Sequence, residues 1–365
     1  MSSVNATVAN ARSAGADVPA HADVHRLRRR LLQLAVLVVA VIALLTFVPG
    51  LTGVRARFRD AAPGWLAVAG MLELLSCLSY VAVFRAAFCS RLGWRTSYLI
   101  GMAELAANSL LPAGGAGGLA LGAWALRRGG LPAERIARRT VAFFLITSAA
   151  NVTALALVGV ALALGLLAGH AGLGLTLGPA AVAVAAVAVA LRVPRLARRA
   201  RRPESSRDSR ARRLASQIGV ALGDGVEDAL ILLRARDPWL LAGAAGYLAF
   251  DVAVMWAAFR AFGPAPPVGI LLIAYLVGQL GGLIPLPGGI GGAEGGLIGA
   301  LVLYGVPAAA ATAAVLAYRA LLLLVPAVVG GAALLRLRRV LGMDPAPRFP
   351  CAPGAEDVRP VPAIA

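Results

Sequence analysis

The chain has 365 residues, of which 59% are hydrophobic and only 14% are charged. Soluble domains carry about 25% charged residues, so this composition excludes an ordinary soluble protein. The net charge of +18 comes from arginine, because the chain contains no lysine. The arginines lie between apolar segments, where the positive-inside rule and anionic lipid headgroups account for them. We therefore expect membrane lipids, and no nucleic acid, as partners.

The first membrane half is predicted over residues 28–191, after a polar stretch, 1–27, that we expect to be a disordered cytoplasmic tail. Windows of about 17–25 apolar residues mark the spans. An interrupted apolar segment, 97–126, separates the second span from the third. The full spans predicted for this half are Leu31–Val48, Trp65–Phe88, Val141–Leu167 and Leu175–Leu191.

A basic cytoplasmic loop is predicted over residues 192–237, because ten arginines lie between Arg192 and Arg213. The later part of this loop, Leu214–Arg236, is amphipathic, and we expect it to lie on the membrane surface.

The second membrane half is predicted over residues 238–340. Its full spans are Pro238–Phe262 and Ala308–Leu335, on either side of a second interrupted segment, 268–304. Residues 341–365 are rich in proline, and we expect them to form a disordered cytoplasmic tail.

The two interrupted segments resemble each other, because each contains a Leu-Pro step followed by a cluster of glycines. Such a break leaves backbone amides and carbonyls unpaired, which a membrane tolerates only where protein or a wet cavity satisfies them. Paired breaks at matching places in two halves point to a transporter-type site. The break residues are Pro112, Gly114, Gly115 and Gly117 in the first segment and Pro287, Gly288, Gly289, Gly291 and Gly292 in the second.

The arginine clusters decide the predicted topology. If each interrupted segment is a re-entrant hairpin, the main clusters and both termini fall on the cytoplasmic side, and only Arg55, Arg57 and Arg59 fall outside. We therefore predict an all-α polytopic membrane protein with six full crossings and two re-entrant broken-helix hairpins. The hairpins enter from opposite sides, which makes the two halves an inverted-topology repeat. Richness in alanine and arginine indicates a bacterial genome of high GC content, so the expected location is the bacterial cytoplasmic membrane.

The half-helix that comes after each break offers free amide donors and partial positive charge at its start, which suit a phosphate or a carboxylate. Glycines would let this backbone approach an anionic headgroup closely. The alternative is that the glycines permit only tight helix packing. Glu104 and Asn108, in the entering arm of the first hairpin, are candidates to line the same cavity.

Ionisable residues within the apolar segments are the second signal, since each costs at least a few kcal/mol in hydrocarbon. Glu294 lies in the first turn of the second half-helix, and Arg319 lies beside Tyr318 in the last span. We expect Arg319 to pair with Glu294, to present its planar fork to a phosphate, or both. For Glu73 and Asp251 we expect buried hydrogen bonding.

Patterns typical of catalysis are missing from the sequence. There is no nucleophile–base set, no metal cluster and no Walker-type loop, so we expect neither enzymatic activity nor a cofactor nor a metal. The three cysteines have no metal-type spacing and are odd in number, so neither a disulfide framework nor a zinc site is indicated. They are Cys77, Cys89 and Cys351.

The second break, from Pro285 to Glu294, together with Tyr318-Arg319, Pro326 and Gly330 later in the chain, resembles the signature of the lysylphosphatidylglycerol synthase transmembrane (flippase-like) family. In that family the membrane part is associated with moving lysyl-phosphatidylglycerol or other polar lipids between leaflets. Some members also carry a soluble aminoacyltransferase domain, which we do not expect here. The first break departs from the pattern, because many members have an Arg-Gly-Glu type sequence where this chain has alanines and glycines.

The resemblance implies a flippase-like protein that translocates an anionic or polar (glyco)lipid. The alternative is a non-catalytic accessory or scaffold for an enzyme of cell-envelope lipid or glycan synthesis, docked through the stretch from Arg192 to Arg213. A membrane enzyme acting on a lipid-linked sugar is the least supported hypothesis, since no acid–base pair or metal site is evident.

The topology can be tested with single cysteines placed in the basic loop and in the carboxy-terminal tail. The variants Ser205→Cys and Pro345→Cys should resist an impermeant thiol reagent in intact cells, because the arginine clusters hold both positions on the cytoplasmic side. Labelling after permeabilisation is the control. Labelling of either variant from outside contradicts the topology.

Overall fold

The computed structural model describes residues 57–110, 116–200, 223–280, 292–342 and 348–353. All regular structure in these ranges is helical, and five stretches are long and apolar enough to cross a membrane. Those five are Pro63–Phe88, Ala133–Ala163, Leu173–Ala190, Pro238–Phe262 and Ala308–Leu341.

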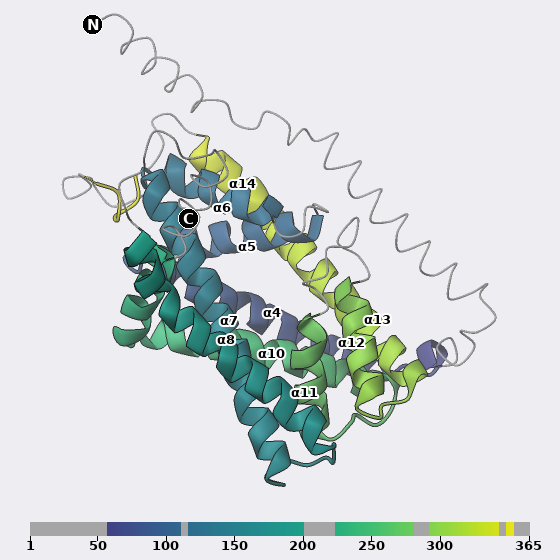
Figure 1. Ribbon diagram of the computed structural model, residues 1–365. Coiled ribbons are helices and arrows are strands. Elements are labelled where there is room, and N and C mark those ends of the chain that lie inside the picture. Colours follow the sequence, from purple (N-terminus) through teal and green to yellow (C-terminus); the bar gives the residue numbers. More distant parts are fainter. Residues whose placement is uncertain (1–56, 111–115, 201–222, 281–291, 343–347, 354–365) are drawn as a thin grey trace, which may run out of the picture. The chain divides into compact units, whose positions relative to one another are not determined.

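The helices follow the predicted order of spans and hairpins (Figure 1). The first half contains α4 (Pro63–Phe88), α5 (Trp94–Leu110), α6 (Ala116–Arg128), α7 (Ala133–Ala163) and α8 (Leu173–Ala200). Residues 223–234 form a further helix. The second half contains α10 (Pro238–Phe262), α11 (Val268–Gly278), α12 (Gly292–Leu303), α13 (Ala308–Val325), the π-helical turn η3 (Pro326–Gly330) and α14 (Gly331–Leu341).

Helices α4 and α10 form the centre of the bundle and pack along each other. Each begins with a proline in its first turn, where the missing N–H costs no hydrogen bond. Asp237 caps α10, because its carboxylate accepts a hydrogen bond of 2.8 Å from the amide of Trp239. The two helices are antiparallel, since the amide of Ala62 before α4 bonds to the carbonyl of Ala261 near the end of α10.

One end of the bundle, here called the arginine end, contains the ends of α4, α6 and α14 and the beginnings of α5, α7 and α10. Hydrogen bonds from Arg139 to the carbonyl of Ala87 and from Arg128 to the carbonyl of Leu341 join these termini. The arginine clusters that the sequence places on one side of the membrane therefore lie together. They include Arg85, Arg91, Arg95, Arg127, Arg128, Arg135, Arg138, Arg139, Arg336, Arg338 and Arg339.

The two interrupted segments are helical hairpins that enter the bundle from different ends. Helices α5 and α6 pack together, and both open onto the arginine end. Helices α11 and α12 also pack together, but α11 begins at the opposite end, where the amide of Gly269 bonds to the carbonyl of Ala168 after α7. Beyond α12, the hydroxyl of Tyr304 bonds to the carbonyl of Leu175 at the start of α8. Each hairpin thus returns to the end at which it began.

Pairs of tryptophans mark two levels on the bundle. At the arginine end Trp94 packs edge-on against Trp239, and the guanidinium of Arg85 lies 4.6 Å from the Trp94 ring centre. At the opposite end Trp65 packs edge-on against Trp256. Trp65 and Arg85 are separated by 20 residues of α4, about 30 Å at 1.5 Å per residue, which is the thickness of the hydrocarbon core of a bilayer. These aromatic pairs are placed as interfacial belts are in membrane proteins.

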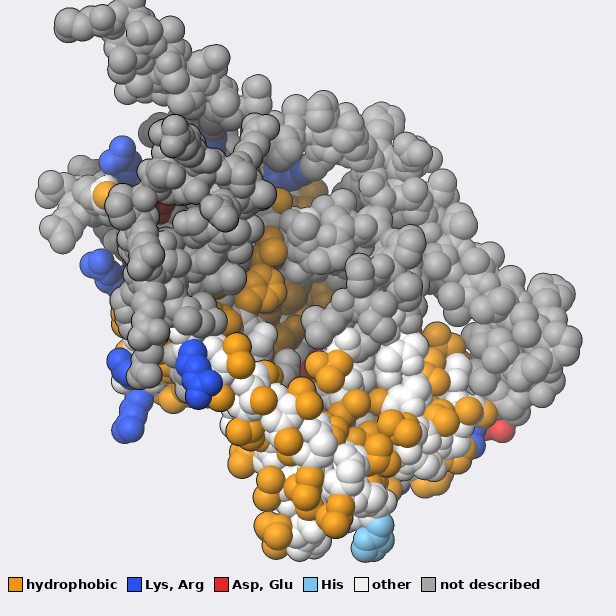
Figure 2. All heavy atoms as spheres, in the orientation of Figure 1, with side chains coloured by type: hydrophobic (Ala, Val, Ile, Leu, Met, Phe, Trp, Pro, Cys, Tyr) orange, Lys and Arg blue, Asp and Glu red, His pale blue; other side chains and the backbone are white. Residues whose placement is uncertain are grey.

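The surface between these levels is apolar. Figure 2 shows hydrophobic side chains spread over much of the described face in view, with arginine side chains grouped at its edge. Leu157 on α7 and Leu173, Val182 and Val184 on α8 are each at least 60% exposed. Apolar side chains this exposed along helices long enough to span indicate contact with lipid.

The predicted spans agree with the helices for most of the described chain. The spans starting at Pro238 and Ala308 begin as predicted, but the basic stretch 134–139, predicted to precede its span, forms the first part of α7. Helix α8 continues past the predicted boundary at Leu191 to Ala200. The first predicted span, Leu31–Val48, lies outside the described residues, so six crossings and the inverted repeat stay predictions.

The structure contains a disulfide, although the cysteines in the sequence indicated no disulfide framework. Cys89, just after α4, is bonded to Cys351, and the two Cα atoms are 6.0 Å apart. The chain returns to the arginine end after α14, where the amide of Phe349 bonds to the carbonyl of Gly129 at 2.8 Å. The pairing joins residues 262 positions apart, so no local spacing in the sequence could indicate it.

The contact between η3 and α5 is tested by substituting two neighbouring glycines. A Cβ on Gly330 would meet the carbonyl of Met102 and, at 2.9 Å, the Cβ of Ala106. Gly330→Ala should therefore lower the free energy of unfolding by about 1–3 kcal/mol. Gly331→Ala is the matched control, because nothing lies within 4 Å of its Cβ position. Unfolding of the purified protein in detergent is the measurement, and equal stability of the two variants contradicts the packing.

Candidate functional site

The predicted ion pair between the second half-helix and the last span is confirmed. Nε of Arg319 on α13 lies 2.7 Å from Oε1 of Glu294. Glu294 lies in the first turn of α12, where a carboxylate also favours the positive end of the helix. The side chains are 28% and 20% exposed, so the pair is shielded but still open on one side. Because the charges cancel, the pair costs less at membrane depth than either charge alone.

A polar cluster with two buried tyrosines lies next to this pair. Asp251 on α10 accepts hydrogen bonds from the hydroxyl of Tyr275 on α11 and, at 2.9 Å, from the hydroxyl of Tyr318 on α13. Nε2 of Gln279, at the end of α11, donates to the hydroxyl of Tyr275 at 2.6 Å. Tyr275 and Tyr318 also pack edge-on, with ring centres 6.3 Å apart. We call Asp251, Tyr275, Gln279 and Tyr318 the tyrosine–aspartate cluster.

Glu73 on α4 lies close enough to Asp251 for the two carboxylates to interact electrostatically. It is 5% exposed, and its Oε1 lies 3.6 Å from the sulfur of Cys77. Within the described residues its Oε2 has no hydrogen-bond partner. Glu73 therefore places a second carboxylate, on α4, near the tyrosine–aspartate cluster.

The first hairpin has a polar arrangement of its own. Oδ1 of Asn108, near the end of α5, accepts a hydrogen bond of 2.8 Å from the amide of Gly118 in the first turn of α6. Asn108 thus satisfies one of the free donors at the start of the half-helix. Glu104 is 4% exposed, and its carboxylate lies where a side chain on Gly122 would be, since Oε2 is 2.9 Å from that Cβ position. The hydroxyl of Tyr80 hydrogen-bonds to Glu104.

The predicted site residues fall into two groups in the structure. Glu294, Tyr318 and Arg319 lie together at the second hairpin, whereas Glu104, Asn108 and Gly117 belong to the first. Gly292 begins α12. The other predicted break residues lie outside the described residues: Pro112, Gly114, Gly115, Pro287, Gly288, Gly289 and Gly291.

Two functional candidates, Tyr275 and Gln279, are absent from the site residues predicted from the sequence. Tyr275 stands alone as a polar side chain in the apolar helix α11, and Gln279 comes four residues later, on the same face. This helical spacing was the available signal. Asp251, for which buried hydrogen bonding was expected, is confirmed in that role and organises the cluster.

Comparison with known families gives a match over most of the chain. Residues 32–330 match the family model described as "Lysylphosphatidylglycerol synthase TM region". The match includes both hairpins, the tyrosine–aspartate cluster and the Glu294–Arg319 pair. No curated protein matches the chain.

The ion pair can be tested with a double-mutant cycle. Arg319→Ala and Glu294→Ala should each lower stability by about 1–3 kcal/mol, because each leaves a charge unpaired in a shielded site. The double variant should lose less than the sum of the two, with a coupling of about 0.5–3 kcal/mol. Unfolding in detergent measures all four proteins. Strict additivity contradicts the contact.

Proposed function

The chain belongs to the lysylphosphatidylglycerol synthase TM region family, and we propose that it translocates an anionic or polar lipid across the membrane. The family makes it an integral membrane protein in lipid or envelope metabolism. The sequence predicts no set of catalytic residues, whereas charged residues and broken helices lie inside the membrane segments. These features favour movement of a lipid headgroup over a reaction that modifies it.

The observation that supports the proposal most is the Glu294–Arg319 pair at the start of a half-helix. Arg319 uses Nε for Glu294, and a guanidinium carries further N–H donors in a planar fork that matches phosphate. The first turn of α12 adds amide donors beside it. A phosphate that arrives here exchanges with Glu294 as the partner of Arg319, so positive charge stays neutralised before and after binding.

The tyrosine–aspartate cluster holds this site in place. Tyr318 and Arg319 are consecutive on α13, so the bond from Tyr318 to Asp251 fixes the rotation of the helix that carries the guanidinium. The bond from Tyr275 fixes α11 on the same carboxylate. In the proposed mechanism the cluster keeps α10, α11 and α13 together while the break between α11 and α12 receives the headgroup.

The packing of the hairpins supports two related pathways for the lipid headgroup, one at each hairpin. The first hairpin contacts η3 and α14 in the second half through α5, and the second hairpin contacts α7 in the first half through α11. Each hairpin thus lies against a spanning helix of the other half, as expected for two halves related by a two-fold axis. We propose that one hairpin opens toward each membrane surface, as in alternating-access transporters.

An accessory or scaffold function is the second candidate. Helix α8 carries the beginning of the basic stretch, with Arg192, Arg195, Arg198 and Arg199, beyond its apolar part. A basic helical extension of this kind could dock an acidic surface of an envelope enzyme. Under this hypothesis, deleting residues 192–213 removes the partner in a pull-down and leaves lipid movement by the purified protein intact.

Lipid movement is tested in proteoliposomes that contain fluorescently labelled phosphatidylglycerol, with an impermeant quencher outside. Wild type should expose the inner-leaflet label, and Gly291→Leu should slow this by about tenfold or more, because a side chain keeps the headgroup from the backbone amides. Gly299→Leu is the matched control, since Gly299 lies two turns into α12 with nothing within 4 Å of its Cβ position. A folded Gly291→Leu protein that moves lipid at the wild-type rate rules out this site.

A further inference from the structure

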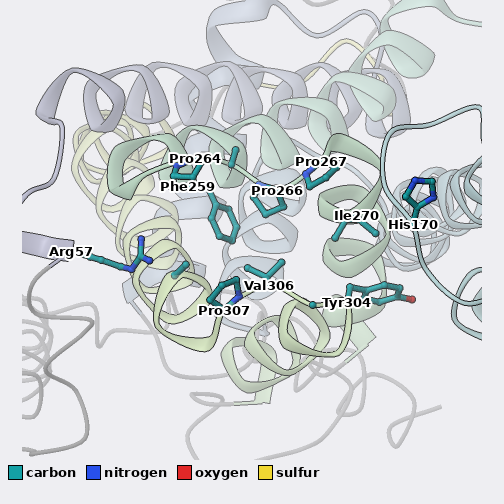
Figure 3. Close-up of a pocket in the computed structure, with 13 residues that line it drawn as sticks. Arg57, His170, Phe259, Pro264, Pro266, Pro267, Ile270, Tyr304, Val306 and Pro307 are labelled. Atoms are coloured by element: carbon teal, nitrogen blue, oxygen red, sulfur yellow. The ribbon is translucent and has the colours of Figure 1, made fainter.

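A cavity lies at the opposite end of the bundle from the arginine end. Its volume is about 380 Å³. Figure 3 shows it between the loop that joins α10 to α11 and the loop that joins α12 to α13, with Arg57 and His170 at different sides of the view. This cavity shares no residue with the tyrosine–aspartate cluster or with the Glu294–Arg319 pair.

The lining of the cavity combines cationic and apolar groups. Arg57 and His170 are its basic side chains, and none of the thirteen lining residues is acidic. Proline provides much of the wall, where it offers rigid apolar surface without an N–H donor. The prolines are Pro264, Pro266, Pro267 and Pro307.

The guanidinium of Arg57 has donors to spare. Nη1 donates to the carbonyl of Phe262 at 3.0 Å, which holds the side chain over the end of α10. A guanidinium carries five N–H donors, so one hydrogen bond to the described residues leaves others for a ligand. Helices α11 and α13 both begin at this wall, and their amino-terminal ends add to the positive potential around the guanidinium.

The depth of the cavity matches the headgroup layer of a bilayer. Arg260 stacks over Trp65 at 5.2 Å, and this tryptophan level lies about 30 Å along α4 from the level at the arginine end. Arg57 precedes Trp65 in the chain, and residues 264–267 come after Arg260, so the cavity lies just beyond the hydrocarbon boundary. Phe58 and Val268 follow the lining residues Arg57 and Pro267 in the chain, and they are 39% and 52% exposed.

We propose that this cavity binds the phosphate headgroup of an anionic phospholipid at the membrane surface opposite the arginine end. The guanidinium of Arg57 contacts the phosphate, and the proline wall contacts the glycerol region. A free phosphate has the charge but gains nothing from the apolar wall. This site goes beyond the proposed translocation site and does not depend on transport.

The inference is tested by titrating the purified full-length protein in detergent with dioleoyl phosphatidylglycerol and counting bound lipids by native mass spectrometry. Arg57→Gln should weaken the binding of one lipid by about tenfold, because a charge-assisted hydrogen bond is lost. Arg59→Gln is the matched control, because Arg59 is exposed at the same end and does not line the cavity. Ala310→Leu, which narrows the cavity and leaves its charge unchanged, should also weaken binding.

Three results would overturn the assignment. They are equal binding by wild type and Arg57→Gln, equal loss in Arg59→Gln, and equal affinity for zwitterionic dioleoyl phosphatidylcholine. Displacement of the lipid by inorganic phosphate at the same concentration would assign the cavity to a free anion instead. Glu294→Gln separates this inference from the proposed function, since it should bind phosphatidylglycerol here normally even when it no longer moves lipid.

Discussion

A carboxylate shielded inside a membrane bundle must find donors within the protein, and the partly buried Asp251 imposes this requirement on three helices at once. Its acceptors are satisfied only when α11 and α13 present Tyr275 and Tyr318 to α10 at the same depth. Arg319 then points to the start of α12, where Glu294 neutralises it. The position of the second hairpin therefore depends more on these hydrogen bonds and the ion pair than on apolar packing. Apolar packing selects helix neighbours only weakly in a membrane, because lipid tails are as apolar as the side chains.

The two hairpins meet this requirement in different ways. In the second, a charged pair and the partly buried carboxylate of Asp251 hold the helices. In the first, Asn108 caps α6 with a neutral side chain, and Glu104 lies against Gly122. The neutral cap by Asn108 fits the departure of the first break from the family signature. The two hairpins thus have a similar arrangement of helices but different electrostatic environments. A polar molecule would therefore meet different charges in the two halves of the bundle.

Much of the fold could be predicted from the sequence, because long apolar windows and arginine clusters are physical requirements of a membrane-spanning helix. The boundaries at Pro238 and Ala308 and the pairing of Arg319 with Glu294 are of this kind. Other features depend on which helices become neighbours. Tyr275 carries no charge and sits in an apolar segment, so its role is visible only once α10 lies beside it. The disulfide likewise depends on the chain returning after α14, a contact that no periodicity in the sequence encodes.

The bond between Cys89 and Cys351 has a consequence for the covalent structure of the protein. It closes a ring that contains both hairpins, the central basic segment and every described helix after α4. A single cut of the backbone anywhere within this ring leaves one molecule, whose two pieces part only when the sulfurs are reduced. The described helices from α5 to α14 are in this sense one cyclic unit, and α4, which precedes Cys89, is attached to it as a branch.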